Sequence, residues 1–191
     1  MKNYFVTIII ISALALCVVV RQKAQAQMTE TPGTMTAGGT VAQTSNSAPV
    51  FVTEIPPGYR DWRFISVAHE EGSLNDIRVI LGNDVAIKTY REGTLPFPEG
   101  TIIARIAWKY VPSEENNKVF GRNQSFVPGD APEWYLQFMV KDSTKYAATG
   151  GWGYAQFDKD GKPAAASMMT SCFPCHQKIK ERDFVFTRYA P

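Results

Sequence analysis

A five-residue segment near the C-terminus, Cys172-Phe173-Pro174-Cys175-His176, constrains this chain more than any other feature of its sequence. In a helix, residues at i, i+3 and i+4 share one face, so the two thiols and the imidazole would point the same way. A Cys-x-x-Cys-His motif attaches c-type haem because the thiols reach the two vinyl groups of the haem while the imidazole ligates its iron. We therefore predict one covalently attached haem c, bound by Cys172 and Cys175, with His176 as the iron ligand.

The residues around the motif are compatible with a helix. Ser171 precedes the motif and is expected to cap the helix at its N-terminus. Pro174 would then fall in the first turn, where a missing N–H costs little, and residues 177–182 can continue the helix.

Three other uses of paired cysteines compete with haem attachment. A structural disulfide would close a short, strained loop with only two residues between the cysteines. A thioredoxin-like redox motif would need a βαβ context, which is not evident at this position. A zinc site would lack ligands, because His69 is the only other histidine of the chain.

The second axial position of the iron has several candidate occupants. His69 ends a predicted strand, and Met168 and Met169 lie just before the motif, although methionines in such places more often pack against neighbours. We favour an open or water-bound distal site, which implies ligand chemistry rather than simple electron transfer.

Residues 1–26 predict export. Lys2 is followed by an apolar run over residues 4–20, and Ala24-Gln25-Ala26 supplies the small residues for cleavage before Gln27. Arg21 and Lys23 between the run and the cleavage site are unusual in a signal peptide, so a retained N-terminal membrane anchor is the alternative. Either outcome places the rest of the protein in the periplasm.

Residues 27–50 are rich in Thr, Ser, Gly, Ala and Gln and lack a hydrophobic period, so we expect a flexible low-complexity linker before a haem domain over residues 51–191. Removing residues 1–26 takes away three of the 20 Lys and Arg residues and none of the 18 acids, which leaves a net charge of −1. No basic run interleaved with aromatic residues is present, so nucleic acid is excluded as an expected partner.

The alternation of apolar and polar residues predicts β-strands in the domain. The expected strands span residues 61–69, 76–81, 100–110, 134–141 and 151–158. In the clearest strand, residues 100–110, one face would carry Ile102, Ala104, Ile106, Trp108 and Tyr110, and the other Thr101, Ile103, Arg105, Ala107 and Lys109.

Two short helices are expected over residues 84–92 and 143–149, because Asn83 and Asp142 are good N-cap residues. These elements together predict an α+β domain with an antiparallel, mostly five-stranded sheet, a few short helices and a c-type haem bound near the C-terminal helix.

Several segments between residue 55 and the C-terminus resemble a known family. They are Pro-Gly-Tyr-Arg-Asp-Trp at 57–62, Glu-Gly-Thr-Ile-Ile-Ala-Arg at 99–105, Val-Lys-Asp-Ser at 140–143, Gly-Trp-Gly-Tyr at 151–154, the Cys-x-x-Cys-His motif, and Asp-Phe-Val-Phe-Thr-Arg-Tyr at 183–189. On these segments the chain is similar to the cytochrome P-460 family, which includes the cytochrome c′-beta proteins. The resemblance implies an antiparallel sheet, a homodimer and one five-coordinate haem c with His176 as the proximal ligand.

The sequence departs from the hydroxylamine-oxidising members of this family at two places. Those members carry a lysine joined covalently to the haem ring and a distal carboxylate that moves protons. Arg105 stands at the position of the crosslinking lysine, and a guanidinium stays protonated and is a poor nucleophile. Lys109 shares that strand face but lies four residues further, about 13 Å away at strand rise. Residues 163–171 contain no acid.

The c′-beta members instead bind nitric oxide beneath an apolar cap of phenylalanines. Phe64 and Phe97 fall near the matching positions and are therefore cap candidates, although a phenylalanine in a strand or between two prolines often only packs. Arg105 is expected to hold a haem propionate or a bound oxyanion through its fork of donors; the alternative is a solvated arginine on an exposed sheet face.

The sequence therefore predicts an exported mono-haem c-type cytochrome of the P-460 type with an open distal site for small nitrogen species such as nitric oxide. An oxidoreductase acting on hydroxylamine is one alternative, so enzymatic activity on hydroxylamine or nitric oxide stays an open question. A simple electron-transfer cytochrome c is the other, and it would need a strong sixth ligand. A redox partner protein and a second copy of the chain are the expected macromolecular partners.

Overall fold

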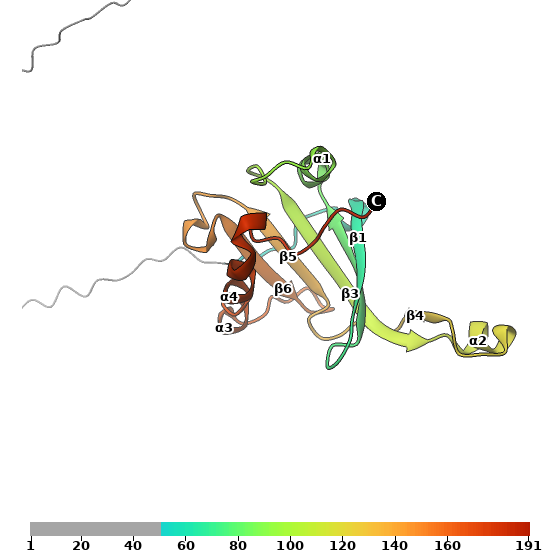
Figure 1. Cartoon of the computed structure of the whole chain (residues 1–191). Helices are drawn as coiled ribbons and strands as arrows, with labels where there is room; N and C mark the ends of the chain where they lie inside the picture. The colour runs from blue at the N-terminus through green and yellow to red at the C-terminus, as the bar shows by residue number, and fades with distance from the viewer. Residues whose placement is uncertain (1–50) are drawn as a thin grey trace, which may run out of the picture. The chain divides into compact units, whose positions relative to one another are not determined.

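The computed structural model describes residues 51–191, so the predicted signal peptide (1–26) and linker (27–50) lie outside the described residues. An antiparallel sheet forms the centre of the domain, with strands in the order β1-β2-β3-β5-β6 and β4 paired to β3 (Figure 1). The strands are β1 (Arg63–Glu70), β2 (Asp76–Gly82), β3 (Ile102–Pro112), β4 (Phe126–Pro128), β5 (Leu136–Lys141) and β6 (Trp152–Phe157). The predicted α+β class with an antiparallel sheet is confirmed.

The helices are short. They are α1 (Asp84–Glu92), α2 (Glu114–Phe120), α3 (Ala166–Met169) and α4 (Cys172–His176), with 3-10 turns η1 (Tyr59–Asp61), η2 (Ala147–Thr149) and η3 (Gln177–Arg182). Helix α1 has the predicted bounds, because the Asn83 side chain accepts the N–H of Ala86 and Gly93 ends the helix in the left-handed region.

The helix predicted over residues 143–149 is wrong in length. The Asp142 carboxylate accepts the N–H groups of Thr144 and Lys145 at 3.1 and 2.8 Å, so the expected cap forms. However, residues 143–146 form only a turn, in which the N–H of Tyr146 donates to the carbonyl oxygen of Asp142 at 2.9 Å, and the 3-10 turn η2 follows. Gly150 and Gly151 then both adopt positive φ before β6 begins.

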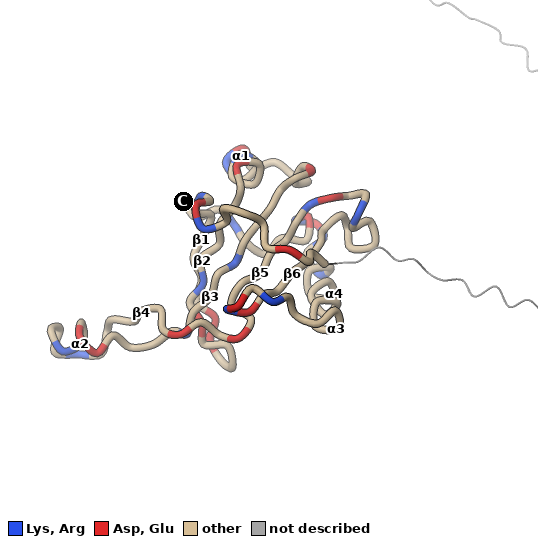
Figure 2. Tube along the Cα trace, turned by 180° about the vertical axis from the view of Figure 1, so that it is seen from behind, with Lys and Arg blue, Asp and Glu red and all other residues tan. Residues whose placement is uncertain are grey.

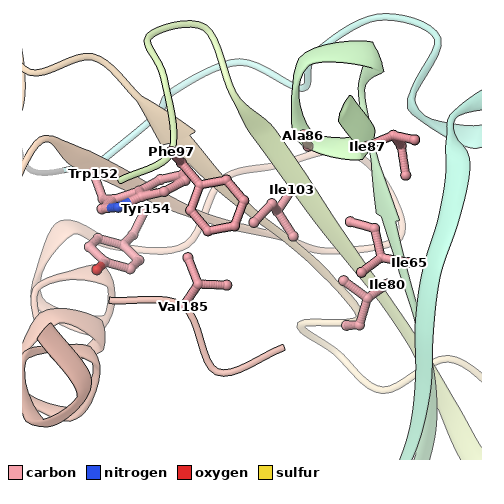
Figure 3. Close-up of a cluster of buried hydrophobic side chains, with 9 residues drawn as sticks. All are labelled: Ile65, Ile80, Ala86, Ile87, Phe97, Ile103, Trp152, Tyr154 and Val185. Atoms are coloured by element: carbon pink, nitrogen blue, oxygen red, sulfur yellow. The ribbon is translucent and has the colours of Figure 1, made fainter. Parts of the chain in front are cut away.

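The two faces of β3 pack against different clusters, as the period of two predicts. One face contributes Ala104 and Ile106 to a cluster with Leu136, Phe138 and Phe157. The other contributes Ile103 to a second cluster with Ile65, Trp152, Tyr154 and Val185 (Figure 3). This second cluster lies between the sheet and the C-terminal segment, and it borders the site described below.

An arm made of the end of β3, α2 and β4 extends away from the other strands (Figure 1). Its sequence did not predict these elements, because residues 113–128 are mostly polar and show no apolar period. The arm is held by local bonds instead: the Ser113 side chain caps α2, and Asn117 bonds to Asn123 and Ser125. Val119 and Phe120 near its tip are 81% and 52% exposed.

Acidic and basic positions are interspersed over the described domain (Figure 2). Within residues 51–191 no helix is both long and apolar enough to span a membrane.

Candidate haem site

The Cys-x-x-Cys-His motif forms α4, as predicted, so its two cysteines and its histidine lie on one helical turn. Cys172 is half-buried, Cys175 is exposed, and both are free thiols. The helix does not continue regularly through residues 177–182, because Ile179 leaves helical geometry at φ −122° and ψ 36° and the segment becomes η3.

The predicted N-cap at Ser171 is wrong. Ser171 has helical dihedrals (φ −73°, ψ −13°), and its hydroxyl donates to the carbonyl oxygen of Met168 at 2.6 Å. The preceding short helix α3 runs almost directly into α4, so the hydroxyl satisfies a carbonyl of α3 instead of capping α4.

His176 is oriented by a backbone carbonyl. Its Nδ1 lies 2.6 Å from the carbonyl oxygen of Phe184. A carbonyl oxygen can only accept, so Nδ1 carries the hydrogen and the Nε2 lone pair of the neutral ring is free to bind a metal. Burial lowers the pKa of His176, while the bond to Phe184 opposes that change. The neutral form needed for iron ligation is therefore favoured.

Two aromatic rings hold the imidazole from the sides. The ring centre of Tyr154, on β6, lies 4.9 Å from that of His176, and the ring centre of Phe186 lies 5.0 Å away. The histidine is thus fixed by one hydrogen bond and two ring contacts between the sheet and the C-terminal tail.

A cavity of about 380 Å³ lies between α4, the sheet and the C-terminal tail, which follows η3 from Asp183 to Pro191. One row of side chains crosses all five ordered strands in register and lines the cavity: Ser66, Ile80, Arg105, Gln137 and Gln156. A second row lines it with Ile103, Met139 and Tyr154. Cys172 and His176 face the same cavity from α4.

A group of charged residues lies at one end of this cavity. Asp76, only 2% exposed, accepts from Arg78 and from Arg105, with a distance of 2.7 Å to each. Glu70 pairs with Arg78 from the partly exposed side. The Arg105 side chain is 15% exposed, so it is not the solvated arginine of the alternative interpretation. Burial, followed by the charge of Arg78, lowers the pKa of Arg105, while Asp76 opposes the change.

Two buried polar atoms at the cavity have no partner among the described residues: the hydroxyl of Tyr154 and the Nε of Arg105. Buried polar groups are nearly always hydrogen-bonded, so such atoms indicate a missing ligand or water. Burial also raises the pKa of Tyr154, which keeps its hydroxyl protonated and able to donate. The propionates of a bound haem, or ordered waters, would supply acceptors for such donors. Together with the Cys-x-x-Cys-His turn and the free Nε2, these residues fit a haem.

The Cys172 thiol is the more protected of the two. Its sulfur lies 3.8 Å from the amide nitrogen of Gln156, and burial raises its pKa. Cys175 is open to solvent on the same turn.

The structure does not bring the two cap candidates to this cavity. Phe64 is 49% exposed, and a β-bulge between Phe64 and Ser66 puts it on the sheet face opposite Ser66. Phe97 is 4% exposed and packs edge-on against Tyr90, whose ring centre is 5.1 Å away. It packs likewise against Trp152, with ring centres 5.8 Å apart (Figure 3). It lines a second cavity of about 360 Å³ beside α1.

The candidate sixth ligands from the sequence also lie elsewhere. The exposed His69 ring lies against Tyr110 in a tilted arrangement, with ring centres 4.0 Å apart, while Met169 is buried and Met168 is exposed on α3. None of these three residues lines the cavity of His176.

Sequence reasoning missed Gln137, Met139, Tyr154 and Gln156, which the strand register places at the cavity. The signal that could have found them is the alternation of β5 and β6, where these four residues occupy the face opposite Leu136, Phe138, Ala155 and Phe157.

Residues 56–187 match the family model described as Cytochrome P460, which is more than two thirds of the chain. The chain belongs to the cytochrome P460 family. Proteins of the cytochrome P460 family carry haem, and the position of Cys172 and Cys175 on α4 is consistent with attachment of that haem through a Cys-x-x-Cys-His motif. No curated protein shows significant similarity to the chain.

Proposed function

We propose that this cytochrome P460 protein is an exported mono-haem c-type cytochrome that binds a small nitrogen species such as nitric oxide at an open distal position. The observation that carries this proposal is the bond from His176 Nδ1 to the Phe184 carbonyl, which leaves Nε2 free beside a cavity that Cys172 also lines. Thioether bonds from Cys172 and Cys175 would hold the haem, and His176 would ligate its iron.

The bound haem supplies an iron with one exchangeable coordination position. The chain supplies the surroundings. Ile80 and Ile103 make part of the cavity wall apolar, whereas Arg105 and Gln137, which are cross-strand partners, offer N–H donors there. Arg105 keeps its Nε free for a propionate or a bound oxyanion, and such a charge-assisted bond typically contributes ~1.5–3 kcal/mol.

Met139 favours a second candidate function, a simple electron-transfer cytochrome. Its thioether lies in the row that includes Tyr154, on the sheet face that lines the cavity opposite α4. A methionine sulfur is a common axial ligand of c-type haem and would close the distal position.

Absorption spectra of the purified ferric and ferrous protein, with and without nitric oxide, test the proposal. A five-coordinate ferrous spectrum that changes on addition of nitric oxide supports the open site. A six-coordinate spectrum that resists nitric oxide, and becomes five-coordinate in Met139→Leu but not in the α3 control Met168→Leu, would establish the electron-transfer function instead. Efficient turnover of hydroxylamine would establish the oxidoreductase alternative.

We also propose export to the periplasm and assembly as a homodimer. The export proposal rests on the apolar run over residues 4–20, and the dimer on the family resemblance together with the exposed apolar residues of the arm, Val119 and Phe120. Light scattering of Val119→Glu against the arm control Lys118→Glu tests the dimer: we expect a monomer from the first and a dimer from the second. A wild-type monomer would contradict it.

A further inference from the structure

A buried ion pair lies behind the turn that orients His176. The Nζ of Lys141, on β5, lies 2.8 and 3.1 Å from the two carboxylate oxygens of Asp183. The two side chains are 6% and 8% exposed. Lys141 also donates to the carbonyl of Gly150 at 3.1 Å and lies 5.0 Å from the ring centre of Trp152. Lys141 thus joins the start of the C-terminal tail at Asp183 to the chain that enters β6.

Asp183 and Phe184 have an uncommon backbone conformation. Their φ angles are 50° and 65°, in the left-handed region that non-glycine residues rarely occupy. Two such residues in succession cost free energy and persist only where the surroundings hold them. The second carboxylate oxygen of Asp183 is held further by the N–H of Phe97 at 2.9 Å.

The left-handed turn directs the carbonyl oxygen of Phe184 at His176. The ring of Phe184 packs directly over Gly150, so closely that a Cβ at that position would collide with it. The carboxylate of Asp183 thus anchors one residue, and the carbonyl of the next residue accepts the Nδ1 hydrogen. No side chain of the ion pair touches the imidazole or lines its cavity.

We propose that Lys141 and Asp183 are positioning residues that set the strength of the His176–Phe184 hydrogen bond and thereby tune the iron. This inference rests on the proposed ligation by His176. Groups that accept the second N–H of a metal-bound histidine fix its orientation and raise its basicity. A loosened turn would lengthen the bond, make the imidazole a weaker donor and stabilise the ferric state less.

The test is the double variant Lys141→Met/Asp183→Asn. It removes both charges, so the net charge near the haem is unchanged and no unpaired charge stays buried. Asparagine tolerates positive φ and keeps an acceptor for the N–H of Phe97. The matched control is Lys88→Met/Glu92→Gln, which makes the same charge change at an exposed pair 3.9 Å apart on α1.

Two readouts report on the proximal bond and not on activity: the iron–histidine stretching frequency of the ferrous protein by resonance Raman, and the reduction potential. We expect a lower frequency and a more positive potential in the double variant, and wild-type values in the control. Asp183→Asn alone should lower the frequency as well.

Wild-type values in a double variant that carries its full complement of haem would overturn the proposal. Failure of both variants to assemble, while the control assembles, would also count against it, because the pair would then serve folding instead of tuning. Failure of the proposed function would give a different result, because the wild-type protein itself would then lack covalent haem or lack an iron–histidine band.

Discussion

The Nδ1 hydrogen of His176 is donated to the backbone carbonyl oxygen of Phe184 over 2.6 Å, and this bond decides which ring nitrogen can face a metal. The acceptor lies eight residues along the chain, beyond a kinked 3-10 segment, so the ligand and its partner are brought together by the fold of the C-terminal tail.

Replacement of His176 by Ala should abolish the native iron coordination, because Nε2 of this residue is the expected proximal ligand. His69→Ala is the control: its ring lies on Tyr110 away from the cavity, so the absorption spectra should match those of the wild type. A change of spin state in His69→Ala would show that His69 reaches the iron.

Peptide mapping by mass spectrometry should find haem bound only through Cys172 and Cys175. Arg105 stands where the crosslinking lysine of hydroxylamine-oxidising relatives is expected, and its guanidinium is paired with Asp76. Arg105→Lys offers a constructive test, since peroxide treatment of that variant would generate a lysine–haem bond if the geometry matches. A haem-linked peptide containing Lys109 in the wild type would contradict the prediction.

Removal of the Asp76 carboxylate should destabilise the fold strongly. Asp76→Ala leaves Arg78 and Arg105 largely buried and only partly paired, and breaking a buried pair in this way typically costs about 3–5 kcal/mol. Asp84→Ala, which breaks an exposed pair with Arg63, should cost no more than about 1 kcal/mol. Urea unfolding of the three proteins measures the difference, and equal costs would contradict the burial argument.

Alkylation of the haem-free protein should distinguish its two thiols. Cys175 is exposed, whereas burial shields Cys172 and raises its pKa, and the thiolate is the reactive form. Below that raised pKa the labelling rate of Cys172 should rise about tenfold per pH unit. Mass spectrometry of iodoacetamide-treated samples follows both sites; faster labelling of Cys172 at neutral pH would contradict the structure.

The fold could largely be predicted from sequence because its main elements carry strong local signals. The alternation over residues 100–110 gave β3 within two residues at each end, and Asn83 and Gly93 bound α1. The arm was not predicted, because α2 and β4 bury little apolar surface and their sequence therefore shows no apolar period. The helix after Asp142 was predicted too long because a good N-cap residue shows where a helix can start but not how many turns follow.

The candidate site, like the fold, could be predicted from the sequence only in part. Its cysteines and histidine are recognisable from spacing alone, and Arg105 was placed on the correct strand face by alternation. Phe64 was made a cap candidate by its position in the family resemblance, and the bulge that puts it on the sheet face opposite Ser66 has no clear sequence signature. The Phe184 acceptor could not be predicted either, because a backbone carbonyl is common to all residues and only the turn selects it.

The turn at Asp183 and Phe184 follows the Cys-x-x-Cys-His motif in the chain, so the motif and the residues that orient its histidine can be separated by truncation. The sheet is complete at Phe157 and the Cys-x-x-Cys-His motif at His176, but the carbonyl that orients the histidine and the carboxylate that anchors it both follow. A gene fragment or splice product that stops after Arg182 would keep the whole recognisable motif and lose its orienting partner. In this chain the motif therefore needs Asp183 and Phe184 as well to give an oriented histidine.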